Sequence, residues 1–216
     1  MEENIFNLNN KIYSNNNNIL LEITNDLYKL INYTHDNTII SIKHYNNGER
    51  YEGEIKNGIR EGKGTYYYKN DIIYTGEWKN NMKEGKGIIS FKDGRRYEGD
   101  WKNDKWEGKG IFYYGNGVRY EGDFTNNKIE GKGIIYLNDG ERYEGDWKNH
   151  NVEGKGVYYY KNGNRYEGDF KNNIKEGKGI TYYNNGDREM GDYLNDKKIG
   201  KHVTLKYNGK VITNIY

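Results

Sequence analysis

The sequence contains no cysteine, proline, alanine or glutamine, and only 33% of its 216 residues are apolar even with tyrosine included. Without cysteine the chain can form no disulfide framework and no thiolate metal site, and it has no cysteine nucleophile. Typical globular domains are nearly half apolar, so we do not expect a thick two-layer core.

The sequence also shows no pattern typical of a membrane-spanning or secretory segment. No apolar run approaches the roughly 20 residues that span a bilayer. The N-terminal residues MEENIFNLNN are acidic and polar, unlike a secretory signal or an Arg-rich transit peptide. We therefore expect a cytoplasmic protein that is not secreted and has no transmembrane segment.

The charge is nearly balanced, with 34 basic and 32 acidic residues and a net charge of +2. A nucleic-acid-binding protein normally has a clear basic excess, so nucleic acid is not an expected partner. Asparagine is abundant, with 33 residues. We attribute most of this asparagine to AT-rich coding rather than to function.

What the chain does contain is an internal repeat, which decides the fold before any other feature. From residue 51 the sequence repeats every 23 residues without an insertion or deletion. A half unit, residues 42–50, precedes the first full unit, and a degenerate seventh unit begins at Glu189. The six full units begin at Tyr51, Tyr74, Tyr97, Tyr120, Tyr143 and Tyr166.

Each unit predicts a β-hairpin. In the fifth unit, YEGDW alternates with period two, which places Tyr143, Gly145 and Trp147 on one face of a strand. The stretch GKGVYYY predicts the second strand. Units are joined by Asn-Gly or Asp-Gly, which predicts a type I′ turn at each junction.

Glycine weakens strands, so its recurrence within these strands needs a reason. If the loop centres the hairpin, Trp147 lies opposite Gly154 and Tyr143 lies opposite Tyr158. The glycines then leave room for rings to lie across a single-layer sheet. On the other face, Asp146 is expected opposite Lys155, which sets the register. The residues that we expect to have this structural role are Tyr97, Gly99, Trp101, Gly108, Gly110, Tyr120, Gly122, Phe124, Gly131, Gly133, Tyr143, Gly145, Trp147, Gly154 and Gly156.

The two ends differ from the repeats. Residues 1–18 are Asn-rich, and we expect them to be disordered. Residues 19–41 predict an N-terminal cap, because Leu20, Ile23 and Leu27 have helical spacing; a partial strand is the alternative. Residues 42–188 hold the half repeat and six full repeats. Residues 189–216 hold the degenerate repeat and a capping hairpin that protects the sheet edge.

The pattern YEG(D/E)W, a polar loop, EGKG, aromatic residues and (N/D)Gx(R) resembles the MORN (membrane occupation and recognition nexus) repeat. The resemblance implies an all-β, elongated, single-layer twisted antiparallel sheet that serves as a scaffold for protein partners. MORN proteins occur in cytoskeletal and ciliary assemblies and at junctional membranes, and related proteins are often dimers, so a homodimer is expected. They also occur beside lipid kinases and ahead of methyltransferase domains, but neither domain follows here.

No motif predicts an enzyme, a cofactor or a metal site. The histidines His35, His44, His150 and His202 occupy unrelated repeat positions, and the carboxylates recur once per unit as lattice residues. The stretch from Glu61 to Gly64 lacks the spacing of a phosphate-binding loop and leads into a strand.

Two binding hypotheses remain. The first is protein binding through a loop stripe, a row of apolar residues in the expected hairpin loops, although each could instead pack on its neighbouring loop. Trp106 is the strongest member, because tryptophan is enriched among binding hot spots. The loop stripe consists of Ile59, Met82, Trp106, Ile129, Val152 and Ile174.

The second hypothesis is binding of acidic phospholipids or phosphoinositides through a basic patch in the second unit. Six basic residues stand there against three acidic ones, and a polybasic patch is attracted to an anionic membrane surface. The interleaved acidic residues allow the alternative of an ordinary solvated face. The basic patch consists of Lys79, Lys83, Lys86, Lys92, Arg95 and Arg96.

Overall fold

The computed structural model describes residues 6–8, 11–13, 19–24, 27–33 and 39–216, with side chains from residue 41 onward. The chain divides into two compact units, Met1–Lys105 and Trp106–Tyr216, and each is described by itself. The described residues form strands and one short 3-10 helix, η1 (Lys69–Asp71), and contain no α-helix. The expected all-β fold is confirmed.

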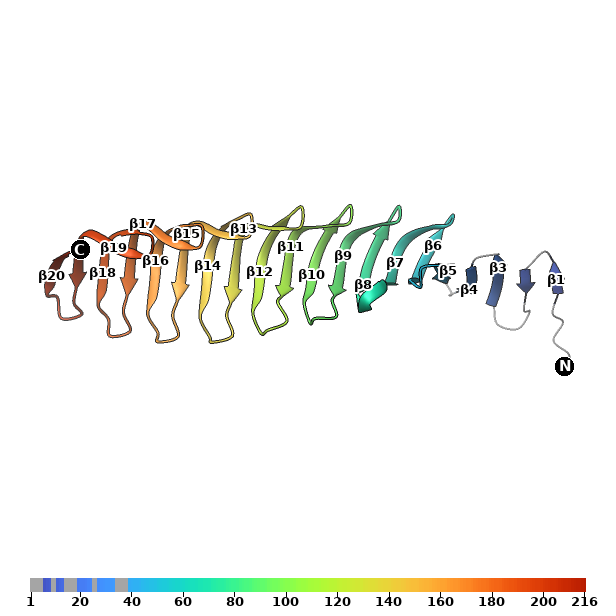
Figure 1. Ribbon diagram of the computed structural model, residues 1–216, viewed down its shortest axis with the longest axis horizontal. Coiled ribbons are helices and arrows are strands. Elements are labelled where there is room, and N and C mark those ends of the chain that lie inside the picture. Colours follow the sequence, from blue (N-terminus) through green and yellow to red (C-terminus); the bar gives the residue numbers. More distant parts are fainter. Residues whose placement is uncertain (1–5, 9–10, 14–18, 25–26, 34–38) are drawn as a thin grey trace. The chain divides into compact units, whose positions relative to one another are not determined.

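The first unit is an antiparallel meander in which each strand pairs with the next along the chain (Figure 1). Its strands are β1 (Phe6–Leu8), β2 (Lys11–Tyr13), β3 (Ile19–Thr24), β4 (Leu27–Tyr33), β5 (Ile39–His44), β6 (Arg50–Lys56), β7 (Ile59–Tyr67), β8 (Ile73–Lys79), β9 (Met82–Ser90) and β10 (Arg96–Lys102).

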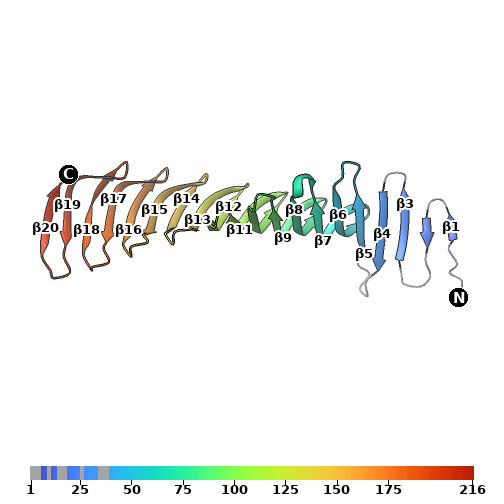
Figure 2. The ribbon, with the colours of Figure 1, turned by 60° about the horizontal axis from the view of Figure 1, so that its bottom comes forward.

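The second unit has the same organisation, and Figure 2 shows its strands following one another in chain order. Its strands are β11 (Lys105–Tyr113), β12 (Arg119–Thr125), β13 (Lys128–Tyr136), β14 (Arg142–Lys148), β15 (Asn151–Tyr159), β16 (Arg165–Lys171), β17 (Ile174–Tyr182), β18 (Arg188–Leu194), β19 (Lys197–Leu205) and β20 (Val211–Ile215). The prediction of tandem antiparallel hairpins is confirmed, and at the C-terminal end β20 pairs with β19.

The N-terminal segment corrects one expectation. Strands β3 and β4 occupy the residues for which we expected an amphipathic helix, and they pair in antiparallel register. The apolar residues of ILLEIT fit a strand as well as a helix, because isoleucine favours strands and alternates with other residues there. The expected disorder of residues 1–18 falls largely on residues outside the described ranges and stays a prediction.

Within each hairpin, the turn has two residues and is usually built on asparagine. Asn126 and Asn127 have φ values of 51° and 65°, and positive φ at both central residues is what a type I′ turn requires. Asparagine tolerates this left-handed conformation better than most residues. Much of the asparagine in the repeats therefore has a structural role, which corrects our attribution of it to coding bias.

The junctions between hairpins use a different turn from the one we expected. Between β15 and β16 only Gly163 has positive φ, at 84°. The Gly163 N–H donates to the Tyr160 carbonyl at 3.0 Å, and the Tyr160 N–H donates to the Asn164 carbonyl at 2.9 Å. This is a three-residue loop with a type I turn followed by a left-handed glycine. The Asn-Gly pair predicted the position of the turn correctly, but the type I′ assignment was wrong.

The core consists of tyrosine rings that cross glycines, as expected. Tyr143 is 2% exposed, and its hydroxyl donates to the Asp146 carbonyl at 3.1 Å. A Cβ atom on Gly145 or Gly156 would lie 2.4 or 2.3 Å from that hydroxyl oxygen. The Trp147 ring stands nearly perpendicular to the Tyr143 ring, with centroids 5.6 Å apart. Such edge-to-face pairs add stability beyond the area they bury.

A β-bulge changes the register that we expected inside each hairpin. Tyr143 lies opposite Tyr158 as predicted, but Trp147 lies opposite Val152 rather than Gly154, because the register shifts between Gly145 and Trp147. Between these two pairs the second strand has more residues than the first, which is a β-bulge. The pairing expected from a symmetric hairpin therefore fails beyond Gly145.

The bulge also changes the expected charge pairs. The Asp146 carboxylate accepts the Lys155 backbone N–H at 2.9 Å, while its ion pair is with Lys132 of the preceding hairpin. The same arrangement joins Lys109 to Asp123 at 2.6 Å. We had expected ion pairs between the two strands of one hairpin. The observed ion pairs instead link neighbouring hairpins.

We predict that Asn172→Ala lowers the free energy of unfolding by about 1 kcal/mol, because alanine is disfavoured in the left-handed region. Asn172 has φ of 49° and opens the turn after β16. Asn172→Gly is the matched control, since glycine adopts this conformation without steric cost. Equal melting temperatures for the two variants, measured by circular dichroism, would contradict the turn assignment.

We predict that Gly156→Val lowers the free energy of unfolding by about 3 kcal/mol, because overpacking against the Tyr143 ring forces the sheet to shift. Lys148→Ala in the same hairpin is the control; Lys148 is exposed, and its loss should cost no more than about 0.5 kcal/mol. Thermal unfolding of the full chain measures both. Similar melting temperatures for the two variants would remove the argument that rings fill the space above the glycines.

Candidate protein-binding groove

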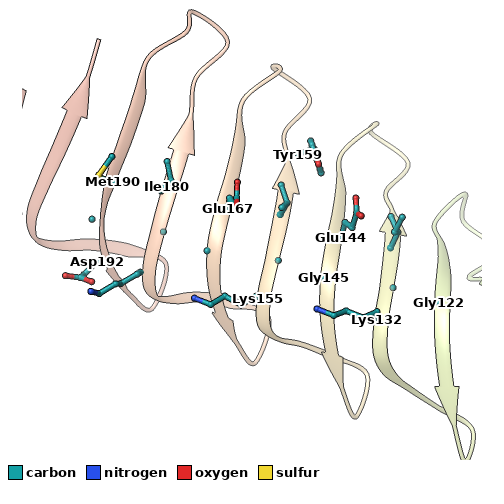
Figure 3. A pocket seen from close by; sticks show the side chains of 18 of the residues that line it. Gly122, Lys132, Glu144, Gly145, Lys155, Tyr159, Glu167, Ile180, Met190 and Asp192 are labelled. Atoms are coloured by element: carbon teal, nitrogen blue, oxygen red, sulfur yellow. The ribbon is translucent and has the colours of Figure 1, made fainter. Parts of the chain in front are cut away.

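A groove of about 1340 Å³ lies along the second unit, lined by residues from β11 to β19. Its side chains come from the face opposite the buried tyrosines. Glu144, for example, lies between Tyr143 and Gly145 in β14 and points to the other side of the sheet. Figure 3 shows lysines at one level of the strands, and Glu144, Glu167, Ile180 and Met190 at the other.

One wall of the groove is a row in which aliphatic residues and glutamates alternate from strand to strand. Each member of the row is paired directly with a member on the neighbouring strand, so the row runs across the strands. At the C-terminal end Met190 stands where the other units have glutamate, which leaves three aliphatic residues side by side. We call this the aliphatic–glutamate row: Ile134, Glu144, Val157, Glu167, Ile180, Met190 and Val203.

The floor of the groove is backbone. Gly145, Gly156 and Gly168 pair with one another across neighbouring strands, and they all line the groove. A Cβ atom at these positions would point toward the tyrosine rings on the other side of the sheet, so on the groove side they present backbone alone. The floor is therefore flat and accessible to a ligand's main chain.

The opposite wall is a row of alternating lysine and aspartate side chains. The ion pairs Lys132–Asp146 and Lys155–Asp169 link its members. Burial raises the pKa of the Asp146 carboxyl, but the hydrogen bonds from the Lys132 ammonium and the Lys155 backbone N–H outweigh this effect, and its pKa lies below the ordinary value. Three of the five lysines on this wall are neutralised by such pairs, whereas Lys178 and Lys201 form no ion pair among the described residues.

Glu144 and Glu167 differ in their ion pairing from Glu121, which occupies the same position in an earlier repeat. Glu121 pairs with Arg119 at 2.7 Å. Arg119 also stacks on a ring, with its guanidinium carbon 4.0 Å from the Tyr136 centroid. In the next two units Arg142 and Arg165 stack in the same way, 3.7 and 3.9 Å from the ring centroids, but do not pair with the glutamate. Among the described residues, the carboxylates of Glu144 and Glu167 form no ion pair.

The loop stripe does not form one row in the structure. Trp106, Ile129 and Val152 lie on the aromatic face, and Trp106 packs against Phe112 and Phe124 with ring centroids 5.2 and 5.9 Å away. The other three members, Ile59, Met82 and Ile174, are the first residues of their strands and are half-buried. They pair with lysines on the opposite face of their sheets.

The basic patch is mostly paired with carboxylates. Lys83 lies on the aromatic face, 5.2 Å from the Trp101 ring centroid, and burial lowers the pKa of its ammonium although Asp104 partly offsets that effect. The other pairs are Lys83–Asp104, Lys86–Asp100, Lys92–Asp71, Arg95–Asp93 and Arg96–Glu98. Of the six patch residues, Lys79 alone forms no ion pair among the described residues, and it is exposed.

The seventh unit contains an exchange that the sequence analysis did not interpret. Glu189 stands at the tyrosine position, and His202 stands at a glycine position of the second strand. The His202 ring is fully buried, and a Cβ atom on Gly191 would lie 2.4 Å from it. Its Nε2 lies 2.9 Å from the Asp192 carbonyl oxygen, where the other units place a tyrosine hydroxyl. The ring has moved to the neighbouring strand, but the glycine beneath it is still covered.

This exchange leaves a buried carboxylate, which is neutralised locally. Burial raises the pKa of Glu189, but hydrogen bonds from Lys198 and Tyr183 outweigh that effect, and the net pKa is lowered. The Lys198 Nζ lies 2.7 and 2.8 Å from the two carboxylate oxygens. In the part of the chain that the structure describes, no cluster of His and acidic residues could hold a metal. His35 lies outside the described residues.

The aliphatic–glutamate row was not predicted from the sequence. Strand alternation had already placed Glu144 opposite the ring-bearing face. The sequence does contain a signal for the row. An aliphatic residue stands ten positions before Glu144 and before Glu167, and Met190 replaces the glutamate in the last unit.

The repeats identify the family. The MORN repeat profile matches residues 51–71, 74–95, 97–119, 120–142, 143–165 and 166–188, which is more than half of the chain. The protein therefore belongs to the MORN repeat family. No curated protein matches the sequence.

The fold is also similar to solved structures of distant sequence. The TCP10 domain of Danio rerio CPAP, in complex with a peptide of Danio rerio STIL, has a TM-score of 0.52 and 12% identity, with both chains fully covered. A point mutant of that domain has a TM-score of 0.47 and 12% identity over 87% of this chain and 95% of that chain. The Drosophila melanogaster SAS-4 TCP domain, in complex with a proline-rich motif of Ana2, has a TM-score of 0.36 and 13% identity over 87% and 90% of the two chains. At these identities the likeness concerns the fold alone.

We predict that the protein loses stability as the pH falls below about 4, because the folded pKa of Asp146 lies below its value in the unfolded chain. Its contribution is present above the unfolded pKa and is lost as the pH falls through the folded pKa. Asp146→Asn should lower the melting temperature at pH 7 and reduce the further loss in acid. Parallel melting curves for the variant and the native chain between pH 7 and pH 3 would contradict this assignment.

Proposed function

We propose that this protein is a non-catalytic MORN-repeat scaffold that binds a segment of another protein in the groove of its second unit. The observation that carries the proposal is the groove itself. At about 1340 Å³ it exceeds the roughly 300–1,000 Å³ of a typical small-molecule pocket. Its length, from β11 to β19, suits a polypeptide better than a metabolite.

The chemistry of the groove favours binding over catalysis. Three of the lysines that line it are paired with the neighbouring carboxylates of Asp123, Asp146 and Asp169, and the rest of the lining is lysine, glutamate, Asp192, Tyr159, aliphatic residues and glycine backbone. Within the described groove lining, no nucleophile is paired with a base. The CPAP domain of similar fold is solved with a bound peptide, which is consistent with a peptide-binding role for this chain.

The setting of this scaffold is part of the proposal: a cytoskeletal or membrane-cortex assembly in the cytoplasm, with a homodimer as one form. No helix among the described residues is long and apolar enough to cross a bilayer. Peripheral binding of acidic phospholipids through the basic patch is the less favoured function, because most of that patch is neutralised by neighbouring carboxylates. Sedimentation with phosphoinositide vesicles tests it directly.

We predict that Val157→Lys reduces capture of the partner from native cell extract at least about tenfold, as expected for a change at the centre of an interface. The new ammonium lies between Glu144 and Glu167, so it fills the groove and pairs with both carboxylates. The fold should be retained, since Val157 is only half-buried.

Trp106→Ala is the control for the loop stripe. Because Trp106 packs on buried rings, this variant should lower the melting temperature and leave capture intact at a temperature where the chain is folded. If Val157→Lys leaves capture unchanged and Trp106→Ala abolishes it without a loss of stability, the groove proposal is wrong and the loop stripe replaces it.

A further inference from the structure

Resting on the proposed function, we propose that the C-terminal end of the groove binds an acidic, aliphatic segment of the partner protein. The site lies on the groove face of β17 to β20, and we call it the C-terminal platform. Three replacements in the last hairpins create it, because each puts an aliphatic residue where earlier repeats have the partner of a cation. The platform consists of Lys178, Arg188, Met190, Lys201, Val211 and Ile215.

The first two replacements free Arg188. In the three preceding repeats the equivalent arginine stacks on a tyrosine ring, and in one of them it also pairs with a glutamate. In the seventh unit Leu205 stands at the position of those tyrosines, and Met190 stands at the position of the glutamate. Arg188 is exposed, and among the described residues it neither stacks on a ring nor forms an ion pair.

The third replacement frees Lys201. In earlier repeats of the second unit, the equivalent lysine pairs with an aspartate directly opposite it on the next strand. The residue opposite Lys201 is Ile215, so this lysine lacks such a partner. Lys178 stands opposite Asp192, yet the two side chains form no ion pair in the described part of the chain.

The platform has an excess of positive charge. On the groove face of β18 and β19, which the structure describes in full, Asp192 is the one carboxylate. The cations on the same face of these two strands are Arg188, Lys197 and Lys201. A surface with an excess of one sign attracts ligands of the opposite sign and speeds their association. We therefore expect the bound segment to be acidic.

The platform also exposes apolar surface. Met190 is 42% exposed, Val211 is 60% exposed and Ile215 is 76% exposed. Val211 and Ile215 lie on the groove face because they pair directly with Leu205 and Lys201. Neighbouring exposed apolar side chains mark interaction sites. A ligand that matches both features of the platform has aliphatic residues beside its carboxylates.

An anionic membrane has similar chemistry, but the rest of the groove face opposes it. Glu144 and Glu167 lie on that face, on β14 and β16, and form no ion pair among the described residues (Figure 3). A membrane lying along the face would bring its anionic headgroups against both carboxylates, whereas a short peptide can end before them. The platform also continues the groove, since Met190 and Lys201 line it. These observations favour a peptide.

The test uses labelled synthetic peptides of about twelve residues, long enough at ~3.3 Å per residue to cross the four strands of the platform. One peptide repeats Leu-Glu-Ser, a second repeats Leu-Lys-Ser, and a third repeats Gly-Glu-Ser. Fluorescence anisotropy with the full chain at physiological salt measures their affinities. We expect Leu-Glu-Ser to bind at least about tenfold more tightly than either control, a difference of ~1.4 kcal/mol.

Met190→Glu is the most specific variant, because it restores the glutamate of the preceding repeats. The new carboxylate repels the acidic peptide and can pair with Arg188, so Leu-Glu-Ser binding should weaken at least about tenfold. Since glutamate is accommodated at this position in the preceding repeats, the melting temperature should change little.

A double variant tests the cations. Arg188→Gln combined with Lys201→Gln should weaken Leu-Glu-Ser binding about tenfold, since two charge-assisted contacts are lost. The matched control is Lys86→Gln combined with Arg96→Gln, which changes the same two repeat positions in the first unit. Carboxylates already engage both of those residues, so the effect of the control should stay within about twofold.

Each outcome has a defined meaning. Equal binding of Leu-Glu-Ser and Gly-Glu-Ser would overturn the proposal, because charge alone would then act. Sedimentation with phosphatidylserine vesicles that Met190→Glu abolishes, without binding of Leu-Glu-Ser, would replace the peptide by a membrane. If Val157→Lys abolishes partner capture but Leu-Glu-Ser does not bind, the groove function stands and this inference fails. If neither effect appears, both fail.

Discussion

The structure depends on one contact, the tyrosine ring that lies over paired glycines. In each full repeat of the second unit, a buried tyrosine such as Tyr120 places its hydroxyl where a Cβ atom of Gly122 or Gly133 would be, 2.4 and 2.2 Å from those positions. The ring supplies the core that a chain so poor in aliphatic residues cannot otherwise build. Because a Cβ atom at these glycines would point to the tyrosine face, the same positions present only backbone on the opposite face, where they form the floor of the groove.

The seventh unit shows that the constraint is geometric rather than tied to one residue type. There the ring comes from His202 on the neighbouring strand, and Glu189 takes the place of tyrosine. The glycine beneath is still covered, and the carbonyl of Asp192 still has a partner. A single exchange would leave either a clash or a void, whereas the double exchange preserves both the packing and the hydrogen bond.

The sequence predicted the fold well because the features that decide it are local and repeated. Strand alternation placed Tyr143, Gly145 and Trp147 on one face correctly, and the strict 23-residue period located every hairpin. It did not reveal the bulge, which depends on how the Asp146 carboxylate bonds the Lys155 backbone. For the same reason the charge pairs were assigned within hairpins instead of between them.

The candidate site was harder to predict, because it depends on which residues lack partners. Glu121 and Glu144 occupy the same repeat position, and the arginine two residues before each of them stacks on a ring, yet only Glu121 also pairs with its arginine. No spacing rule distinguishes them. The loop stripe failed as a single row because Met82 and Trp106 differ by one position in their units, which places them on opposite faces.

The order of the strands gives the second unit a distinct response to force. Every strand from β12 to β19 pairs with its neighbours in the chain, so tension applied across the meander acts on ladders of hydrogen bonds that lie in series. Neighbouring hairpins are also linked through contacts such as the hydrogen bond from the Trp147 Nε1–H to the Gly133 carbonyl, 3.1 Å long. Under such a load the weakest ladder opens first, and each hairpin that opens lengthens the chain by one repeat.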